Sequence, residues 1–477
     1  MTILNSIPST TRKPGQFHEF DLLSGAQGLT PLSNRVLLVG EVLAAGTATL
    51  EEPVQVFDEN DVDDKCGQGS MLALMARKAL ETGRLIGIQP EIWISPVADP
   101  AGTAATFTFT VTAGTAAEAD DIVFRVAGRT LRAGVSAGDD QDAVAAAINT
   151  AIAEAAGQGI LPGTAAAALN VCTFTVANTG VNGNDVTVSV ESVGLTGLTV
   201  TAAAGVAGAG VVTPATALAN SLAKFFEVIA LSNHAAADIT ALLTHTAAAW
   251  APAAKRWVFP LVGETGTLAT ANTLSAAANS ERIGVISYEG SPSLPGEIAA
   301  AVCTAISARA LPNFNWDGQE LPLFVPADSD VYSDTEIESA LAAGTTPLVP
   351  NDQRTFTEIV RLVTTKTLEG GNPFENAKDL ATIRGMVFTI RQLDTTFSQQ
   401  FKGVNKSAQV LKRMRSVAFQ VLQSLEDLGV TQNVVALFPQ LVVETDPVVP
   451  TRALVAVPES IIPNLHQIVM VHTLFVE

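Results

Sequence analysis

The chain has 477 residues, of which 47% are hydrophobic and only 16% are charged, so it can bury large cores. It carries 27 lysines and arginines against 47 aspartates and glutamates, a formal net charge of −20, and phosphate backbones repel such a surface. Nucleic acid is therefore excluded as an expected direct partner. No apolar run reaches the roughly 18 residues of a membrane span, and the N-terminal residues lack the basic head and apolar stretch of a signal peptide. Three scattered cysteines predict reduced, packed thiols and synthesis in the cytoplasm. Length alone suggests about three domains.

Residues 1–34 predict an extended arm, because prolines and glycines interrupt every short apolar patch. From residue 35 the pattern changes to alternating strands and helices. We expect strands at residues 35–41, 54–57 and 90–96, with an acidic turn at 58–64 and a helix beginning at Met71.

The loop before that helix, Cys66 to Ser70, is rich in glycine and could resemble a phosphate-binding loop. It lacks the Lys-Ser/Thr pair of a P-loop, and five nearby acidic residues would repel a polyphosphate. The preferred interpretation is that Ser70 caps the helix.

Residues 101–212 differ in composition from what precedes them. Apolar and threonine residues alternate with period two at 106–112, and a similar alternation recurs at 185–190. A strand is expected at 122–126 and one helix at 140–156. This segment predicts an inserted, mainly-β domain, a pattern that a secreted adhesin module would share.

Continuous apolar runs return at residues 224–231, 256–262 and 282–288, followed by a helix at 296–308. Such runs are typical of strands buried on both faces of a parallel sheet. Residues 35–100 and 213–353 together therefore predict one discontinuous α/β domain.

The C-terminal part predicts an α+β domain over residues 354–465. A strand is expected at 357–365, helices at 379–396, 408–415 and 416–427, and strands at 440–445 and 452–457. Residues 466–477 end the chain as a long apolar strand. Such a strand either pairs within its own subunit or reaches another subunit.

Several of these segments also carry a resemblance. The strand at 35–41, the Gly-x-Gly-Ser loop, the Leu/Met helix and residues 90–96 resemble tail sheath proteins of contractile-tailed phages, with the form in Mu-like phages most similar. The agreement continues in the same order through residues 287–301, 310–312, 321–323 and 358–366. It therefore spans nearly the whole chain.

The resemblance implies a structural subunit that stacks as hexameric rings around a rigid inner tube and contracts. It also implies that the α/β core is the subtilisin-like sheath domain, and that 101–212 is the extra outer domain of Mu-like sheaths. Terminal arms would complete a sheet in neighbouring subunits. The arm residues are Ile3, Leu4, Ile7, Gln467, Ile468, Val469, Met470, Val471, His472, Thr473, Leu474 and Phe475.

Expected partners are further copies of the chain, the inner tube protein, and baseplate and tail terminator proteins. There is no expected membrane insertion, and the product would belong to a phage tail or a headless tail-like particle. A basic stretch in this acidic chain is the candidate contact with the tube, the alternative being a solvated face that balances acids. Its residues are Lys402, Lys406, Lys412, Arg413 and Arg415.

A catalytic role is not expected, and no cofactor or metal is implied. The histidines, His18, His234, His245, His466 and His472, lie away from any Gly-x-Ser-x-Gly spacing. No Cys-x-x-Cys or His-Glu-x-x-His occurs, and the acidic run at 58–64 lacks an EF-hand's glycine and glutamate. The alternatives are an α/β-hydrolase or protease-like enzyme, and another assembly protein such as a capsid or tube subunit.

Overall fold

A computed structural model describes residues 34–467, except 113, 194–196, 310 and 313, together with residues 469 and 470. The predicted N-terminal arm, with Ile3, Leu4 and Ile7, lies outside the described residues. So do Ile468 and Val471 to Phe475 of the predicted C-terminal strand.

One sheet of nine strands forms the centre of the described chain, in the order β14-β16-β15-β13-β12-β11-β1-β3-β2. Its parallel strands are β3 (Glu91–Val97), β1 (Arg35–Glu41), β11 (Val228–Leu231), β12 (Phe259–Glu264), β13 (Gly284–Ser287) and β15 (Thr345–Pro350). Short antiparallel strands lie at the edges: β2 (Val54–Val56), β16 (Thr357–Ile359) and β14 (Gln319–Leu321). Both α/β stretches predicted from the sequence therefore share this sheet.

Helices cover both faces of this sheet, which explains why its central strands are continuously apolar. Val36 and Leu38 of β1 pack on the side of α2 (Met71–Ile86) and α7 (Pro295–Ser307). Leu37 and Val39 point the opposite way, toward α4 (Ala215–Ser221), α5 (Ala236–Ala249) and α6 (Leu268–Ala278). All 13 residues of α7 are buried, so this helix is the centre of the larger core. The smaller α8 spans Asp334–Ala342.

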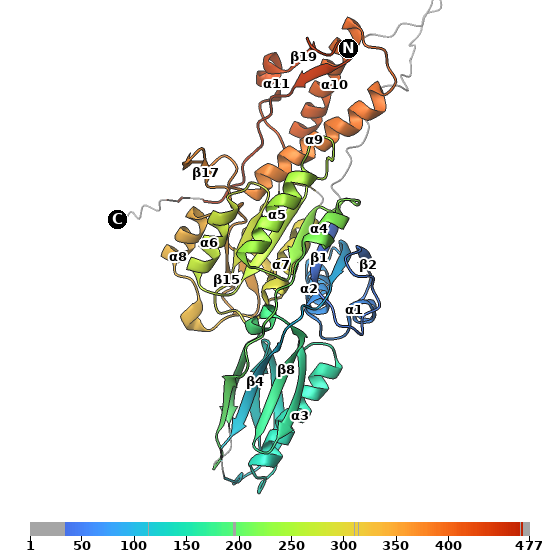
Figure 1. The fold of residues 1–477 in the computed structure, drawn as a ribbon. Helices are drawn as coiled ribbons and strands as arrows, with labels where there is room; N and C mark the ends of the chain where they lie inside the picture. The colour runs from blue at the N-terminus through green and yellow to red at the C-terminus, as the bar shows by residue number, and fades with distance from the viewer. Residues whose placement is uncertain are drawn as a thin grey trace, which may run out of the picture.

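Residues 104–204 form a two-layer unit at the lower end of the molecule (Figure 1). One sheet has the order β10-β4-β8-β7 and the other β6-β5-β9. The strands are β4 (Ala104–Val111), β5 (Asp120–Val126), β6 (Arg129–Val135), β7 (Gly163–Ala168), β8 (Val171–Thr179), β9 (Val188–Val193) and β10 (Val200–Ala204), joined by α3 (Gln141–Gly157) and a 3-10 turn at Val181–Asp185. The inward residues of both sheets and α3 make a core of their own, which Met71, Leu74 and Leu294 of the α/β part extend.

The opposite end carries the C-terminal helices (Figure 1). Helix α9 (Leu380–Phe401) begins inside the main core through Leu380, Ala381 and Ile383, then extends outward and packs on α10 (Ala408–Asp427). Beyond them lie α11 (Val434–Leu437), a 3-10 turn (Phe438–Gln440) and the hairpin β19 (Val442–Thr445) and β20 (Ala453–Ala456). A two-residue hairpin, β17 (Leu368–Glu369) and β18 (Asn372–Pro373), precedes α9.

A buried ion pair fastens α9 to the central sheet. Arg384 Nε donates to Glu227 Oε1 at 2.7 Å, and the two side chains are 0% and 3% exposed. Arg384 Nη1 also donates to the backbone oxygen of Leu311 at 3.1 Å. The buried guanidinium of Arg384 is therefore paired with a carboxylate and a backbone carbonyl at a position that solvent does not reach.

Some sequence predictions need correction. The acidic stretch 58–64 is not a solvated turn, because α1 (Glu59–Cys66) occupies it with Asp58 as its N-cap. Arg77 pairs there with Glu59 at 3.0 Å and also with Asp63, which removes much of the repulsion that the sequence suggested. Ser70 caps α2 as predicted, accepting from Ala73 N at 3.2 Å.

Other corrections concern element boundaries. The two helices predicted at 408–415 and 416–427 are the single helix α10. Nothing in the sequence there breaks a helix, since no glycine or proline separates the two segments. The strand predicted at 357–365 ends at Ile359, and the strand predicted at 224–231 begins only at Val228. Among the helices of the described residues, none is both long and apolar enough to cross a membrane.

Replacing Arg384 by Met should destabilise the protein by about 3–5 kcal/mol, because Glu227 would stay buried without its cation. The double change Arg384→Met with Glu227→Leu should recover most of this loss. Urea denaturation of the unassembled chain measures it. A matched control is Asp394→Asn, also on α9. It breaks an exposed pair with Lys255 and should cost about 1 kcal/mol or less. Equal losses in both single variants would contradict the buried clamp.

Candidate functional site

A polar cluster lies at the carboxyl ends of the parallel strands, where α/β proteins commonly bind ligands. Glu41 ends β1, and its Oε2 accepts a hydrogen bond from Ser232 Oγ at 2.6 Å. Asn182, from the inserted unit, donates to Glu41 and, at 3.1 Å, to Asn233 Oδ1. Burial raises the pKa of Glu41. Each polar group has a partner inside the cluster, so its arrangement serves to join the insert to the sheet.

Two serines that precede α7, Ser291 and Ser293, are engaged with backbone groups. Ser291 Oγ donates to Phe324 O at 2.8 Å, and Ser293 Oγ accepts from Phe324 N at 2.8 Å. Both serines are buried. They hold the segment around Phe324 in place.

The histidines near the sheet are also structural. His245 is buried, and desolvation lowers its pKa to about 4. His234 lies 3.8 Å from Asp185, whose pKa burial raises to about 6. Among the described residues no group of three His, Cys, Asp or Glu side chains is placed to hold a metal ion.

The three cysteines are buried and free. Burial raises the pKa of Cys66 to about 12, that of Cys172 to about 11, and that of Cys303 well above the ordinary range. Because the thiolate is the reactive form, these thiols are chemically quiet.

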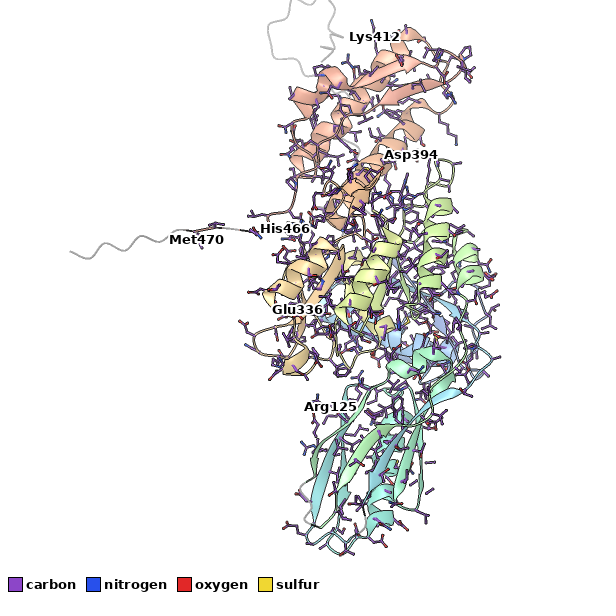
Figure 2. The ribbon with its side chains drawn as sticks, turned by 60° about the vertical axis from the view of Figure 1, so that its left-hand side comes forward. Arg125, Glu336, Asp394, Lys412, His466 and Met470 are labelled. Carbon is purple, nitrogen blue, oxygen red and sulfur yellow. The ribbon has the colours of Figure 1, made fainter. Side chains whose placement is uncertain are left out.

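The predicted basic stretch divides into two groups. Arg415 Nε donates to Leu441 O at 2.7 Å, and Lys406 Nζ bonds Thr445 Oγ1 at 3.2 Å, so both hold the β19–β20 end onto α10. Lys402, Lys412 and Arg413 are exposed. Figure 2 shows Lys412 at the far end of the helical region. Whether any of the five residues contacts an inner tube stays a prediction.

The described part of the predicted terminal strand is not paired. Gln467, Val469 and Met470 belong to no strand in the single chain, and Val469 and Met470 are 89% and 72% exposed. In Figure 2, His466 lies against the body and Met470 stands away from it. A strand forms by pairing with the edge of another strand. The structure holds a single subunit, so pairing of this segment with a neighbouring subunit stays a prediction.

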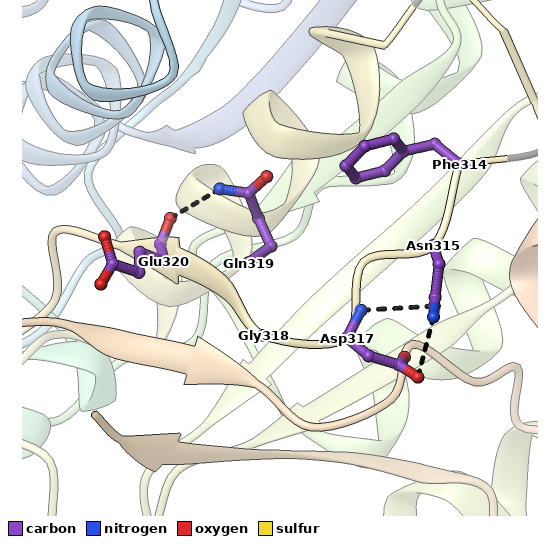
Figure 3. A pocket seen from close by; sticks show the side chains of 6 residues that line it. All are labelled: Phe314, Asn315, Asp317, Gly318, Gln319 and Glu320. Carbon is purple, nitrogen blue, oxygen red and sulfur yellow. Dashed lines mark hydrogen bonds between the residues drawn. The ribbon is translucent and has the colours of Figure 1, made fainter. Parts of the chain in front are cut away.

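The strands predicted at 440–445 and 452–457 are present as the hairpin β19–β20, whereas a hollow beside His466 was not predicted. The hairpin β19–β20 forms a two-stranded sheet, and its side chains include the exposed Val442 and Leu454. His466 lies next to a shallow hollow of about 310 Å³ lined by Phe314, Asn315, Asp317, Gly318, Gln319 and Glu320 (Figure 3). The high β propensity around residue 442 signalled the hairpin, but its open edges could not be read from sequence.

The comparisons with known proteins point in one direction. The curated Mu-like prophage FluMu tail sheath protein of Haemophilus influenzae is 32% identical over 183 residues. The match covers 38% of this chain and 36% of that protein, so the chain spans about a third of the length of the relative that it matches. The resemblance to tail sheath proteins is confirmed. No family model matches the chain.

The structural comparison extends over more of the chain. The contracted helical sheath of the anti-feeding prophage has a TM-score of 0.50 and 11% identity, covering 97% of this chain and 99% of that chain. A sheath tail protein from Desulfitobacterium hafniense has a TM-score of 0.49 and 17% identity, covering 88% and 91%. At such identities the likeness concerns the fold. The mixed α/β class is as expected, and the subtilisin-like layout stays a prediction.

Replacing His245 by Leu should reduce acid destabilisation of the unassembled chain. Its folded-state pKa of about 4 is below the ordinary 6.5, so between these values the unfolded state binds a proton that the folded state excludes. Stability is therefore lost as the pH falls from about 6.5 to about 4, by roughly 3 kcal/mol from this group.

Urea midpoints at pH 7 and pH 4.5 measure the effect. The variant should lose less stability than the parent chain over this interval. The same change at the partly exposed His234 serves as the matched control. An identical acid response in the parent and in His245→Leu would contradict the assignment.

Proposed function

We propose that the chain is the structural subunit of a contractile tail sheath, which polymerises as stacked hexameric rings around an inner tube and contracts. The observation that carries the proposal is the 32% identity to a Mu-like prophage tail sheath protein. A fold shared along nearly the full chain with a contracted sheath supports it. The engaged serines and buried His245 favour this structural role over the alternative of a hydrolase or protease.

Strand exchange through the termini is the proposed means of linking subunits. The hairpin β19–β20 has two open edges, and two-stranded sheets are marginally stable in water unless more strands join them. Beyond His466, the apolar side chains of Val469 and Met470 are exposed. A donated strand would satisfy the hairpin's edge amides and carbonyls and cover Val442 and Leu454.

Each such contact is weak alone, because a net hydrogen bond contributes only about 0.5–1.5 kcal/mol. Many contacts repeated along a polymer make the linkage strong, since every subunit would be held by several neighbours. Links made through terminal arms would also let the subunit bodies rotate as rigid units while the links persist.

The domain roles follow from this proposal. Residues 35–100 with 213–353 would form the sheath domain, 354–465 the inner domain that receives the arms, and 101–212 an outer domain. Residues 1–34 and 466–477 would be the arms. Partners would be the inner tube, baseplate and terminator proteins, because related solved structures include an anti-feeding prophage baseplate. The protein would be made in the bacterial host and reside in a virion tail or a headless tail-like particle.

Deleting residues 1–20 or 467–477 should leave a folded monomer that builds no tubes. The reason is that each deletion removes a donated strand but no core residue that the structure describes. Circular dichroism reports the fold and electron microscopy reports the tubes. Replacing residues 103–211 by a short Gly/Ser linker is the control deletion and should preserve tubes. Ordered sheath from either arm deletion would refute strand exchange.

Reversing both Lys412 and Arg413 to Glu should prevent assembly around inner tubes at low salt and spare tube-free polysheath. These side chains are exposed, whereas Arg415 holds its own domain together and is left intact. Exposed pairs contribute only about 0–1 kcal/mol each, so the contact would align subunits and still release them. Arg132→Glu, an exposed reversal on the insert, is the matched control. If both assemblies persist in the double variant, the tube contact lies elsewhere.

A further inference from the structure

The insert, residues 104–204, is attached to the α/β core at two separate places. At the first place, Met71 N, at the start of α2, donates to Asn178 Oδ1 at 2.9 Å. At the second place, the turn between β5 and β6 packs against the ring of Phe324, beside Lys78. Lys78 follows Met71 by two turns of α2, so the two attachments are about 10 Å apart along this helix.

Phe324 is held firmly from the side of the core. Its backbone N donates to Ser293 Oγ and its backbone O accepts from Ser291 Oγ, both at 2.8 Å. The centroid of its ring lies 5.3 Å from Lys78 Nζ of the core and 4.9 Å from the guanidinium carbon of Arg129 in the insert. A cation close to an aromatic ring is attracted to it, and more strongly where water is excluded. Lys78 is only 2% exposed, so the ring connects a buried cation of the core with a cation of the insert.

The turn that meets this ring has a shape that only glycine permits. Val126 and Arg129 are paired, which leaves Ala127 and Gly128 as a two-residue turn with φ angles of +48° and +74°. Two positive φ angles are typical of a type I′ hairpin turn. A Cβ atom added to Gly128 would lie 2.3 Å from Phe324 Cδ2, closer than two carbon atoms can approach. The turn and the ring are therefore in direct contact.

Beside this contact the seam between insert and core is open. A hollow of about 560 Å³ is lined by Arg125 and Glu191 of the insert and by Val325 and Arg354 of the core, among others. Figure 2 shows Arg125 at this junction. A body that is attached at one place can pivot there when space is free beside it. The contact with Phe324 is the second attachment, which removes that freedom.

We infer that Phe324 is a positioning residue: it sets the angle of the insert on the core, so that the two parts turn as one rigid body. Without its ring, the insert stays attached near Met71 and tilts into the hollow. The consequence for contraction rests on the proposed function. When the core of a sheath subunit rotates, the insert rotates through the same angle and keeps its outer surface in one fixed orientation.

The test measures the angle of the insert in the full-length, unassembled chain. Thr150→Cys on α3 and Thr240→Cys on α5 place one spin label on each part, because both positions are exposed. The three native cysteines are buried and stay unlabelled. Pulsed electron paramagnetic resonance then gives the distribution of distances between the labels. A rigid junction gives one narrow distance.

Two variants at residue 324 test the role of the ring. Phe324→Ala should lose the single narrow distance and give a broad distribution, whereas Phe324→Tyr, which keeps the ring, should retain the narrow distance. Circular dichroism confirms that both variants are folded. The inference is overturned if Phe324→Ala keeps the parent distribution, or if Phe324→Tyr broadens it as much as Phe324→Ala does.

A pair of glycines provides a matched control that leaves Phe324 in place. Gly128 and Gly138 both have positive φ angles, +74° and +90°, but no atom lies within 4 Å of a Cβ added to Gly138. Gly128→Ala should shift or broaden the distance, and Gly138→Ala, with similar backbone strain, should not. Equal effects of the two changes would also overturn the inference. Because the readout needs no polymer, it is independent of whether the chain forms tubes, which electron microscopy tests separately.

Discussion

The buried ion pair between Arg384 and Glu227 fixes the position of α9 relative to the central sheet. Glu227 immediately precedes β11 in the centre of the sheet, and Arg384 lies in the first turns of α9. The same guanidinium binds the backbone after α7. Three distant segments thus meet at one side chain. If this contact were broken, both charged groups would stay buried without a partner, which is unfavourable. Helix α9 and the sheet are therefore expected to move as one body.

That rigidity limits where motion can occur. Helix α9 projects about 33 Å if its 22 residues are straight, and its far half carries α10 and the β19–β20 hairpin. The insert is fastened at the other end by Asn182 and Asn178, the latter accepting from Met71 N at 2.9 Å. In the proposed contraction, the adaptable parts would then be the arms, and the body between them would transmit rotation.

Electrostatics adds a second constraint. The net charge of −20 opposes contact between copies of the chain. Several of the cations that could offset this repulsion are already paired within one chain. Arg77 neutralises the acids of α1, and Arg415 and Lys406 hold the terminal hairpin. In the proposed strand exchange, contacts through apolar, uncharged arm residues would avoid this repulsion. Backbone hydrogen bonding is therefore a suitable means of assembly for an acidic subunit.

Local signals made the helix at Met71, with its Ser70 cap, and the apolar strands of the sheet predictable from sequence. The resemblance to sheath proteins could be recognised for the same reason, since each of its segments is a short continuous run of sequence. The Arg384–Glu227 pair joins residues 157 positions apart, and His466 meets Asp317 across 149, so no local pattern reveals either contact. The acidic helix α1 has local signals, the Asp58 N-cap and the Asp61–Lys65 pair one turn apart, but no local pattern reveals the pairing of its acids with Arg77, which lies outside it.

The buried, unreactive thiols have a consequence for the storage of a sheath particle outside the cell. In the proposed role, a tail assembled in a reducing cytoplasm would later meet oxidising surroundings, where exposed thiols would couple neighbouring chains. Cys66, Cys172 and Cys303 are all buried with raised pKa values, so they offer neither access nor thiolate for that reaction. Links between copies would then stay non-covalent during storage outside the cell. A stored particle would keep its ability to rearrange, because no covalent bond has to be broken before its subunits can turn.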